Sequence, residues 1–178
     1  MFDAQPQLDG ATTTSKVSWF AVRVRSNFER RTAELLRGKG YTELTPFYRV
    51  ERRWSDRTKE VEVALFTGYV FCQFEPAQRL PILQTPGVVD VVRFGMQFIP
   101  VDEAEINAIR RVVVSGSEVI PWPYLREGQR VRIRSGSMRG LEGILVEEKG
   151  TRRLVLSITL LKRSASVEID RSEVEPIP

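Results

Sequence analysis

The sequence predicts an α+β protein, in which an N-terminal antiparallel sheet flanked by helices precedes a small five-stranded SH3-like β-barrel. Segments with strand and helix periodicity alternate up to about residue 115. After residue 125, only short strands with glycine-containing turns follow, as in small barrels. The stretch Pro121-Trp122-Pro123 between them is stiff and has no periodicity. We therefore expect a disordered tail over 1–16, a first domain over 17–115, a linker over 116–125 and a barrel domain over 126–178.

The first domain begins with a strand and a helix. Residues 17–25 alternate along the chain and predict a strand with two faces. One face carries Phe20, Val22 and Val24, and the other carries Trp19, Ala21 and Arg23. Ser26 and Glu29 have the spacing of a capping box, which predicts that a helix begins there and continues to Gly38 and Gly40.

Two extended, highly charged segments, 41–54 and 58–66, predict a hairpin joined near residues 55–57. Solubility explains its basic residues as well as DNA binding does: Arg49, Arg52, Arg53, Arg57 and Lys59. The continuous apolar run 68–74 predicts a central strand, in which Cys72 is a small buried hydrophobe.

A short helix from Pro76 to about Gln84 comes next. Residues 88–94 then predict a buried strand, with Val88, Val89, Val91 and Val92 in the pleat. Asp102 and Glu105 form a second capping box, before a helix whose apolar stripe contains Ile106, Ile109 and Val113.

The barrel is expected to contain five strands, at about 130–134, 141–149, 154–159, 166–169 and around Val174. In the first strand, Val131 and Ile133 share one face, whereas Arg130, Arg132 and Arg134 share the other. The glycines of the following turn allow bends without steric cost: Gly136, Gly140 and Gly143. This pattern resembles a KOW element, found in proteins that work on nucleic acid or the transcription machinery.

Charge and composition narrow the function classes. The net charge is +4, and residues 121–178 carry 11 basic against 8 acidic residues. This excess favours association with phosphate backbones, although a solvated barrel surface explains it equally well. The chain has no histidine and one cysteine, which excludes an intrachain disulfide, a Cys/His zinc site and a Ser-His or Cys-His nucleophile. We expect no enzyme, no metal and no other cofactor.

The N-terminal segment 1–16 lacks the pattern of a secretory signal, and no apolar run is long enough to cross a bilayer. We therefore expect a cytoplasmic protein without membrane association.

Three segments carry a family resemblance: Trp19-Phe20-Ala21-Val22, Phe66-Thr67-Gly68-Tyr69-Val70-Phe71 and Thr85-Pro86-Gly87-Val88. With the KOW element, they resemble the NusG family of transcription elongation factors over about residues 17–178. The resemblance implies an NGN-type domain that binds RNA polymerase, followed by a KOW domain. The divergence is similar to that of specialised paralogues such as RfaH and the antiterminators of polysaccharide operons.

The resemblance implies that the first domain docks on the clamp helices of RNA polymerase through a concave apolar surface. The matching positions are Pro46, Phe47, Phe66, Gly68, Tyr69 and Phe71. Aromatic residues dominate the energy of many interfaces, and the hydroxyl of Tyr69 favours a half-exposed position. The alternative is that these aromatic residues fill the core of the sheet.

The resemblance also places upstream or non-template DNA of the transcription bubble near a basic group: Arg23, Arg25, Arg30 and Arg31. Arginine suits phosphate contacts and stacks on unpaired bases. A solvated helix face explains Arg30 and Arg31 equally well.

In the second domain, the resemblance implies a partner loop at Leu160, Leu161, Lys162 and Arg163. Within the family this loop contacts either the terminator Rho or a small-subunit ribosomal protein. Leu161 replaces the aromatic residue of housekeeping members, which puts Rho recruitment in doubt. The β-branched strands favour a constitutive barrel over a switch to helices.

We expect a monomeric transcription elongation factor that binds RNA polymerase and modulates pausing, termination or antitermination, as an operon-specific antiterminator. The alternative is an RNA-binding or ribosome-associated KOW protein.

Overall fold

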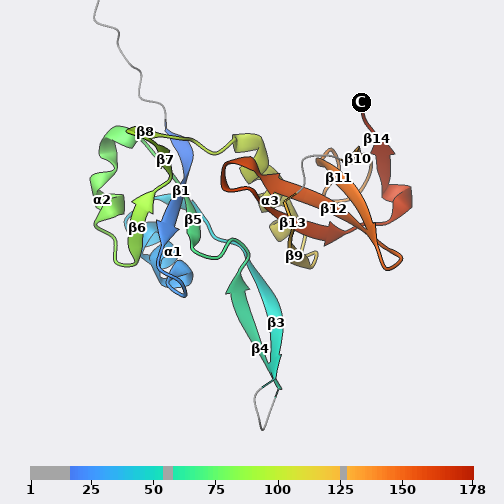
Figure 1. Ribbon diagram of the computed structural model, residues 1–178, viewed down its shortest axis with the longest axis horizontal. Helices are drawn as coiled ribbons and strands as arrows, with labels where there is room; N and C mark the ends of the chain where they lie inside the picture. Colours follow the sequence, from blue (N-terminus) through green and yellow to red (C-terminus); the bar gives the residue numbers. More distant parts are fainter. Residues whose placement is uncertain (1–16, 54–57, 125–127) are drawn as a thin grey trace, which may run out of the picture.

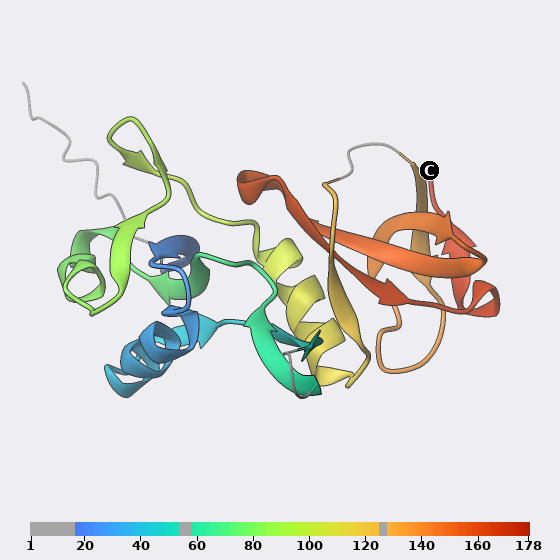
Figure 2. The ribbon, with the colours of Figure 1, turned by 60° about the horizontal axis from the view of Figure 1, so that its bottom comes forward.

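The computed structural model describes residues 17–53, 58–124 and 128–178. The expected tail over 1–16 and the expected hairpin turn near 55–57 lie outside the described residues. Two sheets form the framework, and helix α3 (Glu103–Val114) lies between them (Figures 1 and 2). The predicted fold class is confirmed.

The N-terminal sheet has four strands in the order β2-β5-β1-β6. The strands are β1 (Ser18–Val24), β2 (Thr42–Leu44), β5 (Tyr69–Phe74) and β6 (Val88–Val91). β1 pairs antiparallel with β5, and Arg23 lies directly opposite Tyr69. β5 lies between two neighbours, as its continuous apolar run predicts.

Both faces of this sheet are buried, because helices cover each side. Phe20, Val22 and Val24 pack with residues of α1 (Glu29–Gly38) and of α2 (Leu80–Leu83). Trp19 and Ala21 lie on the opposite face and pack with Ile106, Ile109 and Val112 of α3. A short 3-10 turn, Pro76–Gln78, precedes α2. The two faces predicted for the first strand are confirmed.

Three local predictions need correction. No side chain caps α1, whose N-cap is Phe28, so the predicted capping box at Ser26 is wrong. The buried stripe of α3 contains Val112, while Val113 is 40% exposed, because successive helical residues point in different directions. Val89 is exposed, because β6 is the edge strand of its sheet. The Asp102 cap of α3 is confirmed, since its carboxylate accepts a hydrogen bond from the Ala104 amide at 2.8 Å.

Two hairpins stand apart from the N-terminal sheet. β3 (Phe47–Arg53) and β4 (Thr58–Ala64) form a two-stranded ribbon that extends away from the rest of the molecule (Figure 1). The predicted charged hairpin forms, but its first arm begins at Phe47 and not at residue 41, because Thr42–Leu44 pair with β5 of the main sheet. β7 (Arg93–Phe94) and β8 (Gln97–Phe98) form a second, shorter hairpin. The strand expected over 88–94 is therefore divided between β6 and β7.

The C-terminal sheet has six strands in the order β14-β10-β11-β12-β13-β9. Its strands are β9 (Val119–Trp122), β10 (Gln129–Ile133), β11 (Glu142–Glu148), β12 (Thr151–Ile158), β13 (Arg163–Glu168) and β14 (Val174–Pro176). Two 3-10 turns, Thr159–Leu161 and Arg171–Glu173, connect the last strands. Five strands match the prediction, and β9 adds a sixth from within the segment expected to be a linker.

The two halves of the chain share one hydrophobic cluster, in which Phe66 and Ile106 lie in the same group as Val131 and Leu154. Val131 and Ile133 are buried while Arg130 and Arg132 are exposed, as the alternation of this strand predicts. None of the helices in the described ranges is long and apolar enough to span a membrane.

Candidate functional site

Tyr69 lies at the start of β5, directly after a tight turn. Gly68 has a φ of +83°, a conformation that glycine adopts without steric cost. The Gly68 amide donates to a carboxylate oxygen of Glu29 at 2.8 Å, and the Gly68 carbonyl oxygen accepts from the Val24 amide at 2.9 Å. The turn is therefore held from α1 and from β1. Glu29, predicted as part of a cap, instead positions the residue beside Tyr69.

Phe66 and Phe71 support this turn from the core. Their side chains are 1% and 0% exposed, and their rings meet edge to face at 5.3 Å. Pro46 is also buried, and its carbonyl oxygen accepts a hydrogen bond from the Leu65 amide at 2.9 Å. Of the predicted docking residues, Phe47, Gly68 and Tyr69 are only partly buried. For Phe66 and Phe71, a docking role stays a prediction.

Phe47 is covered from the side of α1. The Arg30 guanidinium lies 4.1 Å from the ring centre of Phe47 and forms an ion pair with Glu62 at 2.6 Å. Arg30 therefore joins α1 to the ribbon. This contact explains the presence of a cation there without nucleic acid.

The barrel turn covers Tyr69. Arg163 places its guanidinium 5.0 Å from the ring centre of Tyr69 and donates a hydrogen bond to the Thr67 carbonyl oxygen at 2.6 Å. Leu160 and Leu161 pack against the hydrophobic cluster that Tyr69 also contacts. The predicted partner loop and the predicted docking surface thus lie against each other.

Glu105 of α3 forms a second contact with the same turn. Its carboxylate accepts hydrogen bonds from the Thr159 amide at 3.1 Å and from the Thr159 hydroxyl at 2.5 Å. The spacing of Asp102 and Glu105 predicts a local capping box, so the sequence carried no signal for this long-range bond. We use the term latch for two sets of hydrogen bonds together: the bond from Arg163 to Thr67, and the bonds from Thr159 to Glu105.

A third contact lies farther along α3. Arg111 donates hydrogen bonds to the carbonyl oxygens of Arg139 and Ser137. Between α3 and the barrel lies a cavity of about 830 Å³, whose lining includes Ala104, Ala108 and Gly143. Polar contacts and this hollow therefore flank the hydrophobic cluster that the two halves share.

All four of the predicted nucleic-acid-binding residues are exposed. Within the described part of the chain, Arg30 pairs with Glu62, whereas Arg23, Arg25 and Arg31 form no ion pair. Arg23 is the cross-strand neighbour of Tyr69, so it lies beside the candidate docking residue.

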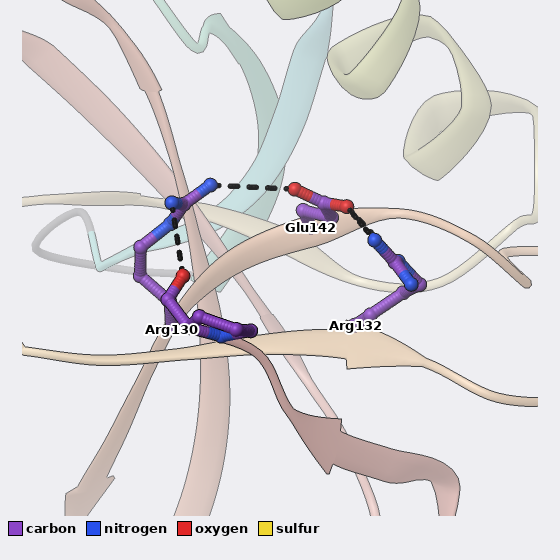
Figure 3. A network of polar contacts seen from close by, with 4 residues as sticks. Arg130, Arg132 and Glu142 are labelled. Atoms are coloured by element: carbon purple, nitrogen blue, oxygen red, sulfur yellow. Dashed lines mark hydrogen bonds and ion pairs between the residues drawn. The ribbon is translucent and has the colours of Figure 1, made fainter.

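The positive charge of strand β10 in the barrel is partly neutralised. Glu142 lies between the guanidinium groups of Arg130 and Arg132, at 3.4 Å and 2.6 Å (Figure 3). The hydrogen bond and the charge of Glu142 raise the pKa of Arg132 above its ordinary value. One carboxylate shared by two arginines leaves less free positive charge than the sequence indicates.

Over the described ranges, no cluster of three or more acidic or cysteine side chains is arranged to hold a metal ion. The thiol of Cys72 is buried, and burial raises its pKa to about 12. Such a thiol is protonated at neutral pH and is a poor nucleophile.

Comparisons with known proteins find a family model, relatives and a solved structure that this chain is similar to. The family model described as "Transcription termination factor nusG" matches residues 17–110. The transcription termination/antitermination protein NusG of Thermus thermophilus is 29% identical, over 89% of this chain and 97% of its own length. The protein of the same description from Lactococcus lactis is 29% identical, over 89% of this chain and 92% of its own. A solved structure, "Domain interaction in Thermotoga maritima NusG", is similar with a TM-score of 0.52 at 24% identity, over 92% of this chain and 98% of that one.

Proposed function

The chain belongs to the NusG family of transcription termination/antitermination factors, and we propose that it binds RNA polymerase through the surface around Tyr69. On this proposal, residues 17–115 form the polymerase-binding unit and residues 126–178 recruit a further partner. The observation that carries the proposal is the turn at Gly68. Bonds from α1 and β1 hold this turn, and the side chain of Tyr69 beside it is only partly buried.

Support for docking at Tyr69 comes from its surroundings. Tyr69 packs against the hydrophobic cluster in which Phe66 and Phe71 are fully buried. A preorganised aromatic side chain loses little conformational freedom on binding, which favours affinity. In the polymerase, the clamp helices are the proposed contact.

Arg23, Arg25 and Arg31 are proposed to contact upstream or non-template DNA while the polymerase is bound. Their exposure and their lack of ion pairs among the described residues support this role, whereas Arg30 is engaged by Phe47 and Glu62. Free guanidinium groups suit phosphate contacts.

The barrel turn is proposed to recruit a small-subunit ribosomal protein through Leu160, Leu161, Lys162 and Arg163, and Rho recruitment stays in doubt. In the structure Arg163 lies over Tyr69, so binding at either proposed surface competes with the closed latch. A factor held closed until it is recruited suits an operon-specific antiterminator acting as a monomer in the cytoplasm.

Retention of the full chain on immobilised bacterial RNA polymerase tests the proposal. We expect retention of the natural chain and at least a tenfold loss for Tyr69→Ala, because truncation of a central aromatic residue typically costs 2 kcal/mol or more, about thirtyfold in affinity. The matched control is Tyr41→Ala, which removes a tyrosine that packs on the opposite side of the sheet, in the cluster with Leu36. Equal retention of all three proteins would disprove the proposed surface.

A further inference from the structure

The ribbon formed by β3 and β4 has two chemically different faces. Cross-strand partners share a face, so Tyr48 with Val63, Val50 with Val61 and Arg52 with Lys59 lie on one side. We call these six residues the apolar-basic face. The other side carries a mixture of both charges: Arg49, Glu51, Arg53, Glu60 and Glu62.

The apolar-basic face is continuous with the surface around Tyr69. Tyr48 packs against the same hydrophobic cluster as Tyr69, Leu160 and Leu161. The opposite face turns toward α1, because Phe47 and Glu62 there contact Arg30. The ribbon therefore extends the proposed docking surface outward from Tyr69.

Arg52 and Lys59 lie directly opposite each other at the outer end of this face. Two like charges in such a pair repel and weaken the ribbon. Within the described ranges neither residue forms an ion pair, whereas Arg49 on the other face pairs with Glu60 at 3.8 Å. The arrangement costs stability and leaves two cations available to a partner.

We infer that the apolar-basic face binds an amphipathic helix of RNA polymerase that carries an apolar stripe and acidic side chains at one end. This inference rests on the proposed function and specifies the partner surface. Tyr48 to Arg52 span about 14 Å, which matches two to three turns of a helix. The apolar pairs beside the cations favour a protein over nucleic acid, because a phosphate backbone offers no apolar group to cover Val50 and Val61.

Two neighbouring substitutions test the inference in the full chain with immobilised bacterial RNA polymerase. Arg52→Glu reverses a charge on the apolar-basic face, and Arg53→Glu reverses the same charge on the other face. Both positions are exposed, and neither touches the latch. We expect Arg52→Glu to weaken polymerase binding about fivefold, with a reduced dependence on salt, and Arg53→Glu to change it less than twofold. Lys59→Glu should behave like Arg52→Glu.

The outcomes separate the two proposals. Loss of retention with Tyr69→Ala but equal binding of Arg52→Glu and Arg53→Glu would overturn only the ribbon surface. Failure of the natural chain to bind polymerase would overturn the proposed function and this inference together. If Arg52→Glu weakens binding to a 30-base-pair DNA duplex and leaves polymerase binding unchanged, the ribbon contacts nucleic acid and the inference is wrong.

Discussion

Arg163 of the barrel stacks on Tyr69 of the N-terminal sheet, with its guanidinium 5.0 Å from the ring centre. The same side chain donates a hydrogen bond to the Thr67 carbonyl oxygen, so it contacts both the ring of Tyr69 and the turn that precedes Tyr69. A residue expected to contact one partner is thereby used to cover the residue expected to contact another. Any ligand that binds either side chain tightly competes with this contact and favours separation of the two halves.

The latch should open when its polar contacts are removed. Arg163→Ala combined with Glu105→Ala removes the cation over Tyr69 and the acceptor of Thr159, which together shift the closed-to-open ratio by roughly tenfold. Spin labels on cysteines introduced at the exposed Glu34 and Glu148 should report a broader distance distribution.

The control for the latch is Arg152→Ala, because Arg152 pairs with Glu147 of the neighbouring barrel strand and takes no part in the latch. This variant should keep the narrow distribution of the natural chain. A double variant that also keeps it would show that the latch does not hold the two halves together.

The strand β9 should limit how far the barrel can move once the latch is open. β9 pairs with β13 at four positions, and Val119 is buried in the cluster. Only residues 115–118 separate α3 from β9, which allows at most about 18 Å between Val114 and Val119. Without this pairing, the chain from Val114 to Gln129 would reach about 50 Å.

Insertions on either side of β9 test this tether in the opened double variant. Eight Gly/Ser residues after Ser117 lengthen the connection and should broaden the label distances. The same eight residues after Tyr124 lie between β9 and β10 and should leave the distances unchanged. Equal broadening by both insertions would mean that β9 is not paired with β13 in solution.

Gly87 should not tolerate a side chain. It has a φ of +92°, and an added Cβ would lie 2.4 Å from the Thr32 hydroxyl oxygen. Gly87→Ala should therefore lower the free energy of unfolding by about 2 kcal/mol or more. Gly38→Ala is the control, since no atom lies within 4 Å of that position and its φ is not positive. Urea denaturation measures both, and an equal effect of the two substitutions would contradict the expectation.

Cys72 should make the protein sensitive to alkaline pH. Its pKa is raised from 9.0 to about 12 by burial, so the unfolded chain loses the thiol proton first. The stability from the protonated thiol is present below about pH 9 and is lost as the pH rises toward 12. Between pH 8 and pH 10.5, the free energy of unfolding should fall by about 2 kcal/mol more for the natural chain than for Cys72→Ala. Parallel pH profiles in urea denaturation would refute this.

Much of the fold could be predicted from the sequence, because the alternation of apolar and polar residues along a strand is visible in neighbouring positions. The alternation of Trp19 to Val24 reveals both faces of β1, and Val131 to Arg134 reveals those of β10. The misplaced features have long-range causes. Glu29 leaves its expected cap to bind Gly68, and Glu105 binds Thr159 of the barrel. Spacing along the chain cannot show a partner 39 or 54 residues away.

The sequence by itself determined the family, the order of the two structural units and the residues with an unusual chemistry, such as Tyr69 in its glycine-containing turn. These depend on periodicity, turn residues and motif, which are local properties. Only the tertiary structure decided which aromatic residues are buried, which arginines are already paired and that Arg163 covers Tyr69. The physical reason is that burial and charge pairing depend on distances between segments far apart in the chain, which no local pattern specifies.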